Sequence, residues 1–207
     1  MKIFNKDFCV FKKKPEEEIT LTPQQNLLSY LRDFTTLIVV VLLVSVLLFR
    51  VVIVSGPSMK NTLIDGDWLI LLNSAIMGEP DKGDIIVASK ESFKNGEPII
   101  KRVIAKEGDE VDIDFTAGIV YVNGEALTEP YTLTPTNIFG GINFPITVDE
   151  GCIFVMGDNR NSSKDSRSIE IGQIDCREVM GKAIFLIFPG KEREQDSRDF
   201  SRIGVLS

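Results

Sequence analysis

The sequence predicts a mainly β fold, an antiparallel sheet of barrel-like or sandwich-like form, preceded by one N-terminal transmembrane helix. Two observations lead to this prediction. The only long apolar run lies between residues 35 and 54, whereas the apolar runs after residue 55 are short and separated by turn residues. Short runs rich in β-branched residues, bounded by Gly, Asn, Asp or Pro, are typical of antiparallel strands.

The apolar run from Thr35 to Val54 contains one charged residue, Arg50, near its far end. About 20 apolar residues can cross a bilayer as a helix, and a long cation near the end can reach the interface. A cleavable secretory signal fits less well, because its apolar region has about 7–15 residues and lies close to the N-terminus. A buried core helix is the other alternative. We predict a membrane-spanning helix over residues 34–54.

Basic residues near the ends of a membrane helix favour the cytoplasmic side. The first cation after the run is Lys60, whereas the cations before it are Lys2, Lys6, Lys12, Lys13, Lys14 and Arg32. We therefore expect a single-pass protein of the cell membrane. Residues 1–33 would be a polar cytoplasmic tail, and the larger part of the chain would be extracellular.

The segment after the span divides into a domain over residues 55–190 and a charged C-terminal tail over residues 191–207. Asn123-Gly124 is the strongest hairpin signal, because both residues adopt positive φ readily. Only residues 169–178 have a spacing of apolar residues that is compatible with a helix. We predict strands in the runs 68–72, 83–89, 98–105, 109–114, 118–127, 152–158 and 181–188.

The chain contains no histidine, and residues 55–207 carry a net charge of −9, from 16 basic and 25 acidic residues. This sign disfavours a nucleic-acid partner. Without histidine or a CxxC motif we expect no metal site. Cys152 and Cys176 fall on the outer side, where an oxidising compartment permits a disulfide; two free buried thiols are the alternative.

Ser58, in the stretch SGPSM just beyond the span, is a candidate nucleophile. Serine needs a base to take its proton, and the usual base, histidine, is absent. Lys101 lies in the middle of an apolar strand, so either it or Arg102 must face something other than open water. A desolvated lysine loses its proton more easily and can act as a general base. The alternatives are a turn serine and an edge-strand lysine.

A densely polar stretch, MGDNRNSSKDSR at residues 156–167, directly follows an apolar strand. It offers hydroxyls, carboxylates and guanidinium groups, which can support a site through hydrogen bonds to its catalytic residues. An ordinary surface turn with an Asp–Arg pair is equally consistent with these residues alone.

Taken together, the motifs resemble the bacterial type I signal peptidases, the Ser/Lys leader peptidases. SGPSM, GDIIV, KRVIAKEGD and GDNRNSSKDSR occur in the order and approximate spacing of that family. The resemblance implies a membrane-anchored endopeptidase that removes signal peptides from exported preproteins after small residues at −1 and −3. It implies preproteins and membrane lipid as partners and no cofactor, and we expect a monomer.

The resemblance also implies roles for individual residues. Ser58 would be the nucleophile and Lys101 the general base, with Ser163 hydrogen-bonded to the lysine. Asp165 and Arg167 would form a supporting ion pair. Asp158 and Arg160 would hold the polar loop at residues 156–167 in place. Shallow pockets for the substrate side chains at −1 and −3 would be lined by Val52, Val54, Met59 and Ile100.

The chain departs from the family pattern in three places. Gly56 stands where some members carry a serine whose hydroxyl completes the oxyanion hole, and Ser55 is the replacement donor that we consider. Asn61 stands where proline is frequent. Arg167 and Gly172 are separated by more residues than usual, so we expect a rebuilt end of that loop.

Two other functions are compatible with parts of the pattern. A self-cleaving repressor-type peptidase has the same dyad and fold, but it would need a DNA-binding module, where this chain has a membrane span and an acidic outer domain. An anchored scaffold without activity would bind export partners, but the presence of both Ser58 and Lys101 argues against it.

Overall fold

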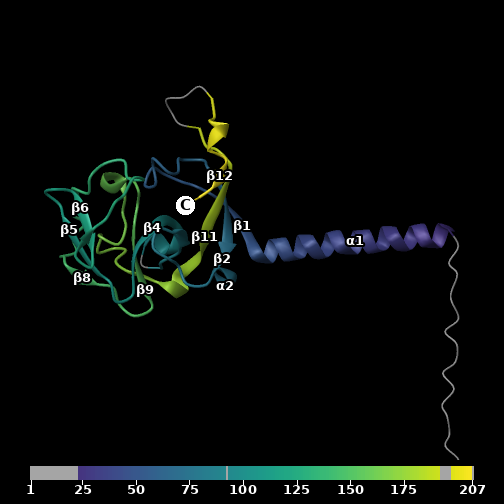
Figure 1. Ribbon diagram of the computed structural model, residues 1–207, viewed down its shortest axis with the longest axis horizontal. Coiled ribbons are helices and arrows are strands. Elements are labelled where there is room, and N and C mark those ends of the chain that lie inside the picture. Colours follow the sequence, from purple (N-terminus) through teal and green to yellow (C-terminus); the bar gives the residue numbers. More distant parts are fainter. Residues whose placement is uncertain (1–22, 92, 192–196, 207) are drawn as a thin grey trace, which may run out of the picture. The chain divides into compact units, whose positions relative to one another are not determined.

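The computed structural model describes residues 23–91, 93–191 and 197–206 (Figure 1). The chain separates into two units, residues 1–43 and 44–207. The first unit contains most of a long helix. The second contains all the strands, and we refer to its residues 49–206 as the β domain.

Helix α1 runs from Pro23 to Leu48, and its residues Asn26–Leu48 are long and apolar enough to cross a membrane. Proline suits the first turn of a helix, where the missing N–H has no intrahelical partner. The predicted bounds of the membrane helix, 34–54, are therefore corrected at both ends. Residues 23–33 of the predicted tail are helical, and residues 1–22 lie outside the described residues.

Strand β1, Phe49–Ile53, takes up the end of the apolar run that we predicted to be helical. It pairs with strand β2, Trp68–Asn73, in antiparallel register from Phe49↔Leu72 to Ile53↔Trp68. An apolar run by itself does not distinguish helix from strand. The β-branched residues at 51–53 and the partner strand β2 decide in favour of a strand.

The larger sheet is antiparallel throughout, in the order β1-β2-β11-β3-β4-β9-β10, with β12 paired to β11. Its central strands coincide with the predicted apolar runs. The further strands of this sheet are β3 Ile85–Ala88, β4 Ile99–Lys106, β9 Cys152–Met156, β10 Ile174–Asp175, β11 Val179–Phe188 and β12 Gly204–Val205. The short helical turns are α2 Ser74–Met77, η1 Lys94–Gly96, η2 Arg160–Ser162, η3 Cys176–Glu178 and η4 Phe200–Arg202.

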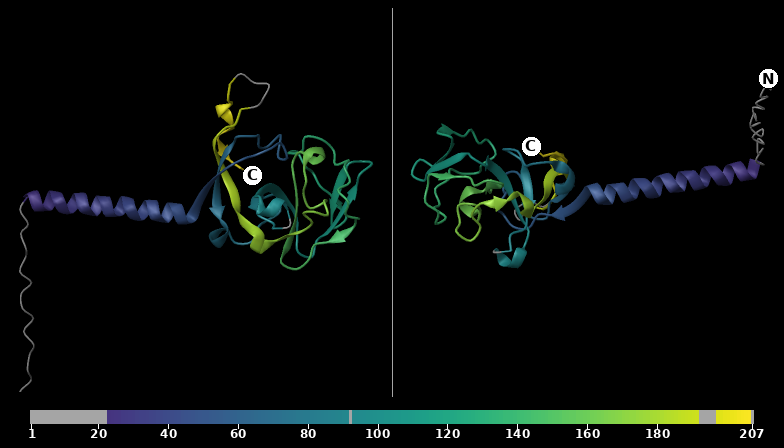
Figure 2. Two further views of the ribbon diagram at one scale, coloured as in Figure 1. Left: turned by 180° about the vertical axis from the view of Figure 1, so that it is seen from behind. Right: turned by 90° about the horizontal axis from the view of Figure 1, so that it is seen from below.

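The smaller sheet lies on the other side of the β domain from β1 and β2 (Figures 1 and 2). Its order is β7-β6-β5-β8, with bounds β5 Glu110–Asp114, β6 Ile119–Val122, β7 Glu125–Ala126 and β8 Ile146–Thr147. Asn123 and Gly124 both have positive φ, 54° and 79°, in the two-residue turn between β6 and β7. The predicted hairpin is confirmed.

Three clusters of buried apolar side chains form the core of the β domain. The one that matters for the site, here called the β1-side cluster, contains Val54, Met59, Leu63, Leu69, Leu71, Ile85, Val87, Ala183 and Leu186. A second cluster centres on Ile86, Val103 and Val155, and a third fills the space between the two sheets. The mainly β, antiparallel fold class is thus confirmed.

One local prediction is wrong. Residues 169–178 form no α-helix; they contain β10 and η3, because Gly172 has a positive φ of 59° and Asp175 caps a new turn with Glu178. The charged C-terminal tail, predicted over residues 191–207, packs in part against the rest of the β domain. Its described part contains β12, and Leu206 packs against the β1-side cluster.

Candidate active site

Ser58 lies in a closed loop between β1 and β2. The loop is closed by backbone hydrogen bonds in both directions between its ends: Val54 N–H donates to Asp67 O at 2.8 Å and Gly66 N–H donates to Val54 O at 2.9 Å. Gly56 has a φ of 89°, a conformation that glycine adopts without strain, and its N–H donates to the Asp65 carboxylate. The backbone around Ser58 is therefore fixed from both sides.

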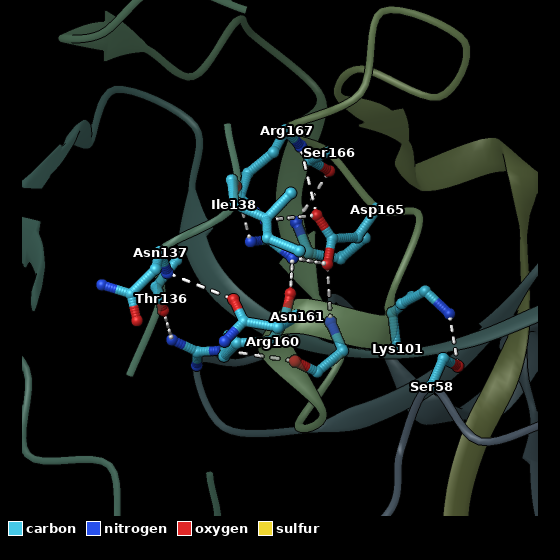
Figure 3. Close-up of polar contacts among 12 residues, drawn as sticks. Ser58, Lys101, Thr136, Asn137, Ile138, Arg160, Asn161, Asp165, Ser166 and Arg167 are labelled. Carbon is cyan, nitrogen blue, oxygen red and sulfur yellow. Dashed lines mark hydrogen bonds and ion pairs between the residues drawn. The ribbon is translucent and has the colours of Figure 1, made fainter. Parts of the chain in front are cut away.

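Lys101 reaches Ser58 from the middle of β4. Its Nζ lies 2.9 Å from Ser58 Oγ (Figure 3). It also lies 2.9 Å from the carbonyl oxygen of Ile100. The lysine is 3% exposed. Arg102, the next residue, is equally buried, so the structure takes both cations of the strand away from water.

Burial lowers the pKa of Lys101 from its ordinary 10.5 to about 8. The carboxylates of Asp165 and Asp158 oppose this effect, and the Arg167 guanidinium reinforces it. With a pKa near 8, about one lysine in ten is neutral at pH 7, against fewer than one in a thousand for a free lysine. A neutral amine at 2.9 Å can accept the Ser58 hydroxyl proton.

The backbone N–H of Ser58 donates no hydrogen bond to any of the described residues. The loop is instead held through its carbonyls, since Asn159 donates from its N–H to Ser58 O and from its side chain to Pro57 O. An unengaged N–H beside a nucleophile is the donor that an oxyanion requires. Ser55 is exposed, and no hydrogen bond among the described residues involves its hydroxyl, so nothing supports it as the second donor.

Ser163 does not form the hydrogen bond to Lys101 that we expected. Its Oγ is buried and has no hydrogen-bond partner among the described residues. The hydroxyl lies against Gly157, where an added Cβ would stand 2.3 Å from Ser163 Oγ and 2.4 Å from Ser58 O. The loop over residues 54–67 carries the candidate nucleophile Ser58 and is called the nucleophile loop below. Glycine at 157 thus lets Ser163 approach this loop. A buried hydroxyl without a partner costs about 1–3 kcal/mol, so an acceptor or donor supplied by a substrate would be favourable here.

Asp165 and Arg167 form the predicted ion pair, and it is buried. Arg167 Nε donates to Asp165 Oδ1 and its terminal nitrogen to Oδ2, both at 2.8 Å. Asp165 also accepts from Gly157 N–H, and Arg167 donates to the carbonyl of Arg160 (Figure 3). The pair therefore fixes the strand end at 157 and the turn that begins at 160.

Asp158 and Arg160 both have partners that the sequence did not indicate. Asp158 forms a forked ion pair with Arg102, at 2.9 and 2.8 Å, and accepts the hydroxyl of Thr62. Arg160 forms its ion pair with Glu129. The apolar strand around Arg102 was a signal for its burial, whereas Glu129 sits in an irregular segment that offered no pattern.

The four residues predicted to line substrate pockets all lie in or against the β1-side cluster. Val54 and Met59 are members of the β1-side cluster at 3% and 1% exposure, and Val52 and Ile100 pack against it while partly exposed. In a substrate-binding surface formed by these four residues, the buried Val54 and Met59 would lie beneath, and the partly exposed Val52 and Ile100 would lie at the sides.

Cys152 and Cys176 are free thiols in the structure. Cys152 packs against the cluster between the sheets and Cys176 against the cluster around Ile86. Within residues 23–91, 93–191 and 197–206, no group of three or more Asp, Glu or Cys side chains could hold a metal ion.

Comparison with known proteins gives one consistent result. A family model described as signal peptidase, peptidase S26, matches residues 27–188. Signal peptidase I of Bacillus licheniformis is 34% identical over 188 residues, which cover 85% of this chain and 96% of the relative. Signal peptidase I T of Bacillus subtilis (strain 168) is 34% identical, over 76% of this chain and 83% of the relative. The probable signal peptidase I-1 of Synechocystis sp. is 38% identical, over 66% of this chain and 69% of the relative.

Proposed function

Since the chain belongs to the signal peptidase family, peptidase S26, we propose that it is a membrane-anchored serine endopeptidase that removes signal peptides from exported preproteins. The observation that carries the proposal is the buried contact of 2.9 Å between Lys101 Nζ and Ser58 Oγ. Nucleophile and base are within hydrogen-bond distance, and the lowered pKa of the lysine suits a base that works near neutral pH.

In the acylation step, Ser58 Oγ attacks the scissile carbonyl carbon while its proton passes to Lys101 Nζ. The Ser58 N–H stabilises the negative charge that develops on the carbonyl oxygen. Protonated Lys101 then gives its proton to the nitrogen of the leaving group as the peptide bond breaks. The mature protein leaves with a free amino terminus, and the signal peptide stays on Ser58 as an ester.

In the deacylation step, a water molecule attacks the ester and Lys101 again takes the proton. The bond to Ser58 Oγ breaks, Oγ recovers a proton from the lysine, and the signal peptide leaves as a carboxylic acid. Ser163 would orient Lys101 or the water through its buried hydroxyl. The ion pair of Asp165 and Arg167 would hold that loop in place.

The specificity for small residues at −1 and −3 would follow from the β1-side cluster. An extended signal peptide can pair with strand edges near β1 and β4, by addition of a strand to a sheet. Val54 and Met59 are already buried beneath that surface, so pockets there would be shallow and apolar. Val52 and Ile100 would limit them at the sides. Ala, Gly and Ser would fit, and larger side chains would not.

The proposal is tested with the full chain in a non-ionic detergent and a preprotein that carries an Ala-x-Ala site. Wild type is expected to cleave after the second Ala, and Ser58→Ala to show no cleavage above background. A substrate with Leu at −1 should react about 100-fold more slowly, equivalent to roughly 2.7 kcal/mol of transition-state free energy. The exposed serine variant Ser74→Ala serves as the control and should behave like wild type. Wild type that binds the preprotein without cleaving it would favour the scaffold function.

The pH dependence of kcat/KM should report the titration of Lys101. The active form is the neutral amine, whose pKa is about 8, so activity should rise with pH and level off above that value. Between pH 6 and pH 9 we expect an increase of about 50- to 100-fold, from the fraction of neutral lysine. A series of initial rates at low substrate concentration measures this. A flat profile would contradict the lysine as the base.

The orientation of the anchor follows from the cations that precede it, which would place residues 1–22 in the cytoplasm and the β domain outside the cell. Protease added to intact protoplasts should therefore digest the β domain, while a tag at the N-terminus stays protected until the membrane is disrupted. Protection of the β domain in intact protoplasts would reverse the assignment.

A further inference from the structure

The described C-terminal segment, residues 197–206, contacts the apolar cluster next to the candidate active site. Strand β12 pairs with Phe185 and Leu186 of β11, and Leu206 N–H donates to Ile184 O at 3.0 Å. Leu206 packs against the β1-side cluster, which contains Val54 and Met59 on either side of Ser58 in the sequence. These residues lie beyond residue 188, where the match to the family model ends.

Arg202 of this segment forms a forked ion pair with Asp67, at 2.9 Å to Oδ1 and 2.7 Å to Oδ2. Asp67 is 0% exposed, and it also accepts the N–H groups of Ile64 and Gly190. Asp67 stands at the end of the nucleophile loop, where its carbonyl accepts the N–H of Val54. The guanidinium thus neutralises a buried carboxylate at the closing point of the loop that carries Ser58.

The same arginine contacts the loop at a second point. Its terminal nitrogen donates to the carbonyl oxygen of Thr62 at 3.1 Å. The hydroxyl of Thr62 in turn donates to Asp158, which is paired with Arg102, the neighbour of Lys101 in β4. Thr62 is therefore the point where the C-terminal segment, the nucleophile loop and the strand of the general base meet.

From these contacts we infer that Arg202 is a positioning residue for the reaction, because it holds the nucleophile loop at Asp67 and Thr62 so that Ser58 stays in line with Lys101. The inference rests on the proposed function. Arg202 touches neither Ser58 nor Lys101 directly, and it acts through the loop. A displacement of about 1 Å between reacting groups can lower a rate by about 100-fold, so a residue that fixes the loop influences kcat more than substrate binding.

The test is steady-state cleavage of the Ala-x-Ala preprotein by the full chain in detergent, with Arg202→Gln as the variant. We expect kcat to fall about 10- to 100-fold while KM stays within about twofold of wild type. Arg198→Gln is the matched control, since Arg198 lies in the same segment but contacts the Phe188 ring and Pro189 O instead of the loop. It should keep the wild-type kcat.

A purely stabilising role would lower the temperature of unfolding without changing kcat of the folded protein, so rates are measured well below the melting transition of each variant. Arg202→Lys supplies a second test that does not depend on the folding of the glutamine variant. Lysine can pair with Asp67 but lacks the fork that also reaches Thr62, so kcat should lie between those of wild type and Arg202→Gln. A wild-type kcat in both variants, or a change in KM alone, overturns the inference. Wild type and Ser58→Ala run in the same assay test the proposed function separately.

Discussion

Replacement of Lys101 by methionine is expected to lower kcat by at least about 1,000-fold, because the proposed base for the Ser58 proton would be lost. Methionine has a similar length and carries no charge. Lys101→Arg should be equally inactive, since guanidinium stays protonated at all accessible pH values. Cleavage assays of both variants measure the effect. Near-normal turnover by Lys101→Arg would exclude a neutral lysine as the base.

The same methionine variant should be as stable as wild type or more stable. The lowered pKa of Lys101 means that the folded state binds its proton less tightly than the unfolded chain does. This costs the wild type up to about 3 kcal/mol at pH values below about 8, and the cost disappears as pH rises from 8 towards 10.5. The advantage of Lys101→Met should therefore be largest at neutral and acidic pH and vanish near pH 10.5. Urea titrations of the full chain in detergent, at pH 7 and pH 10, measure it.

Lys106→Met is the matched control for both readouts. Lys106 is in the same strand, but it is partly exposed and paired with Asp81, a bond that raises its pKa. This variant should retain the wild-type kcat, and it should show no gain in stability at pH 7. A gain equal to that of Lys101→Met would assign the effect to the removal of any cation from β4 and would contradict the role of burial.

Replacement of Arg167 by leucine should cause the second large effect, a loss of about 3–5 kcal/mol in the free energy of unfolding. Asp165 and Arg167 are 1% and 2% exposed, so the carboxylate would be left in the interior with Gly157 N–H and without its forked partner. Arg167 also lowers the pKa of Lys101, so its removal should shift the pH profile of kcat/KM to higher pH in the protein that still folds. Urea titration and the pH series measure the two effects.

Arg177→Leu is the matched control for that variant. Arg177 pairs with Asp175 at the same spacing of two residues, but its side chain is 90% exposed. Solvent screens an exposed pair, so this variant should unfold at nearly the same urea concentration as wild type. Equal losses for Arg167→Leu and Arg177→Leu would mean that burial of the Asp165–Arg167 pair adds nothing to stability.

The sequence by itself was sufficient for the features that depend on local pattern. Short apolar runs bounded by turn residues located the central strands, and Asn123-Gly124 located a hairpin, because each signal is contained within a few neighbouring residues. The residue types at Ser58 and Lys101 pointed to a dyad without histidine, and the resemblance to a family joined them into one site. The apolar run near the N-terminus indicated a membrane anchor.

The tertiary structure decided the features that depend on residues far apart in the sequence, namely where the long helix ends and which charged side chains pair. Helix α1 ends at Leu48, within the apolar run, because the next residues, Phe49–Ile53, pair with β2 as a strand. Asp158 pairs with Arg102 instead of its near neighbour Arg160, and Arg202 reaches Asp67 from 135 residues away. A buried charge takes the partner that the folded backbone brings within about 3 Å, and sequence distance does not enter that choice. The local pattern therefore fixes which residues can do chemistry, and the packing of distant segments fixes which of them hold one another in place.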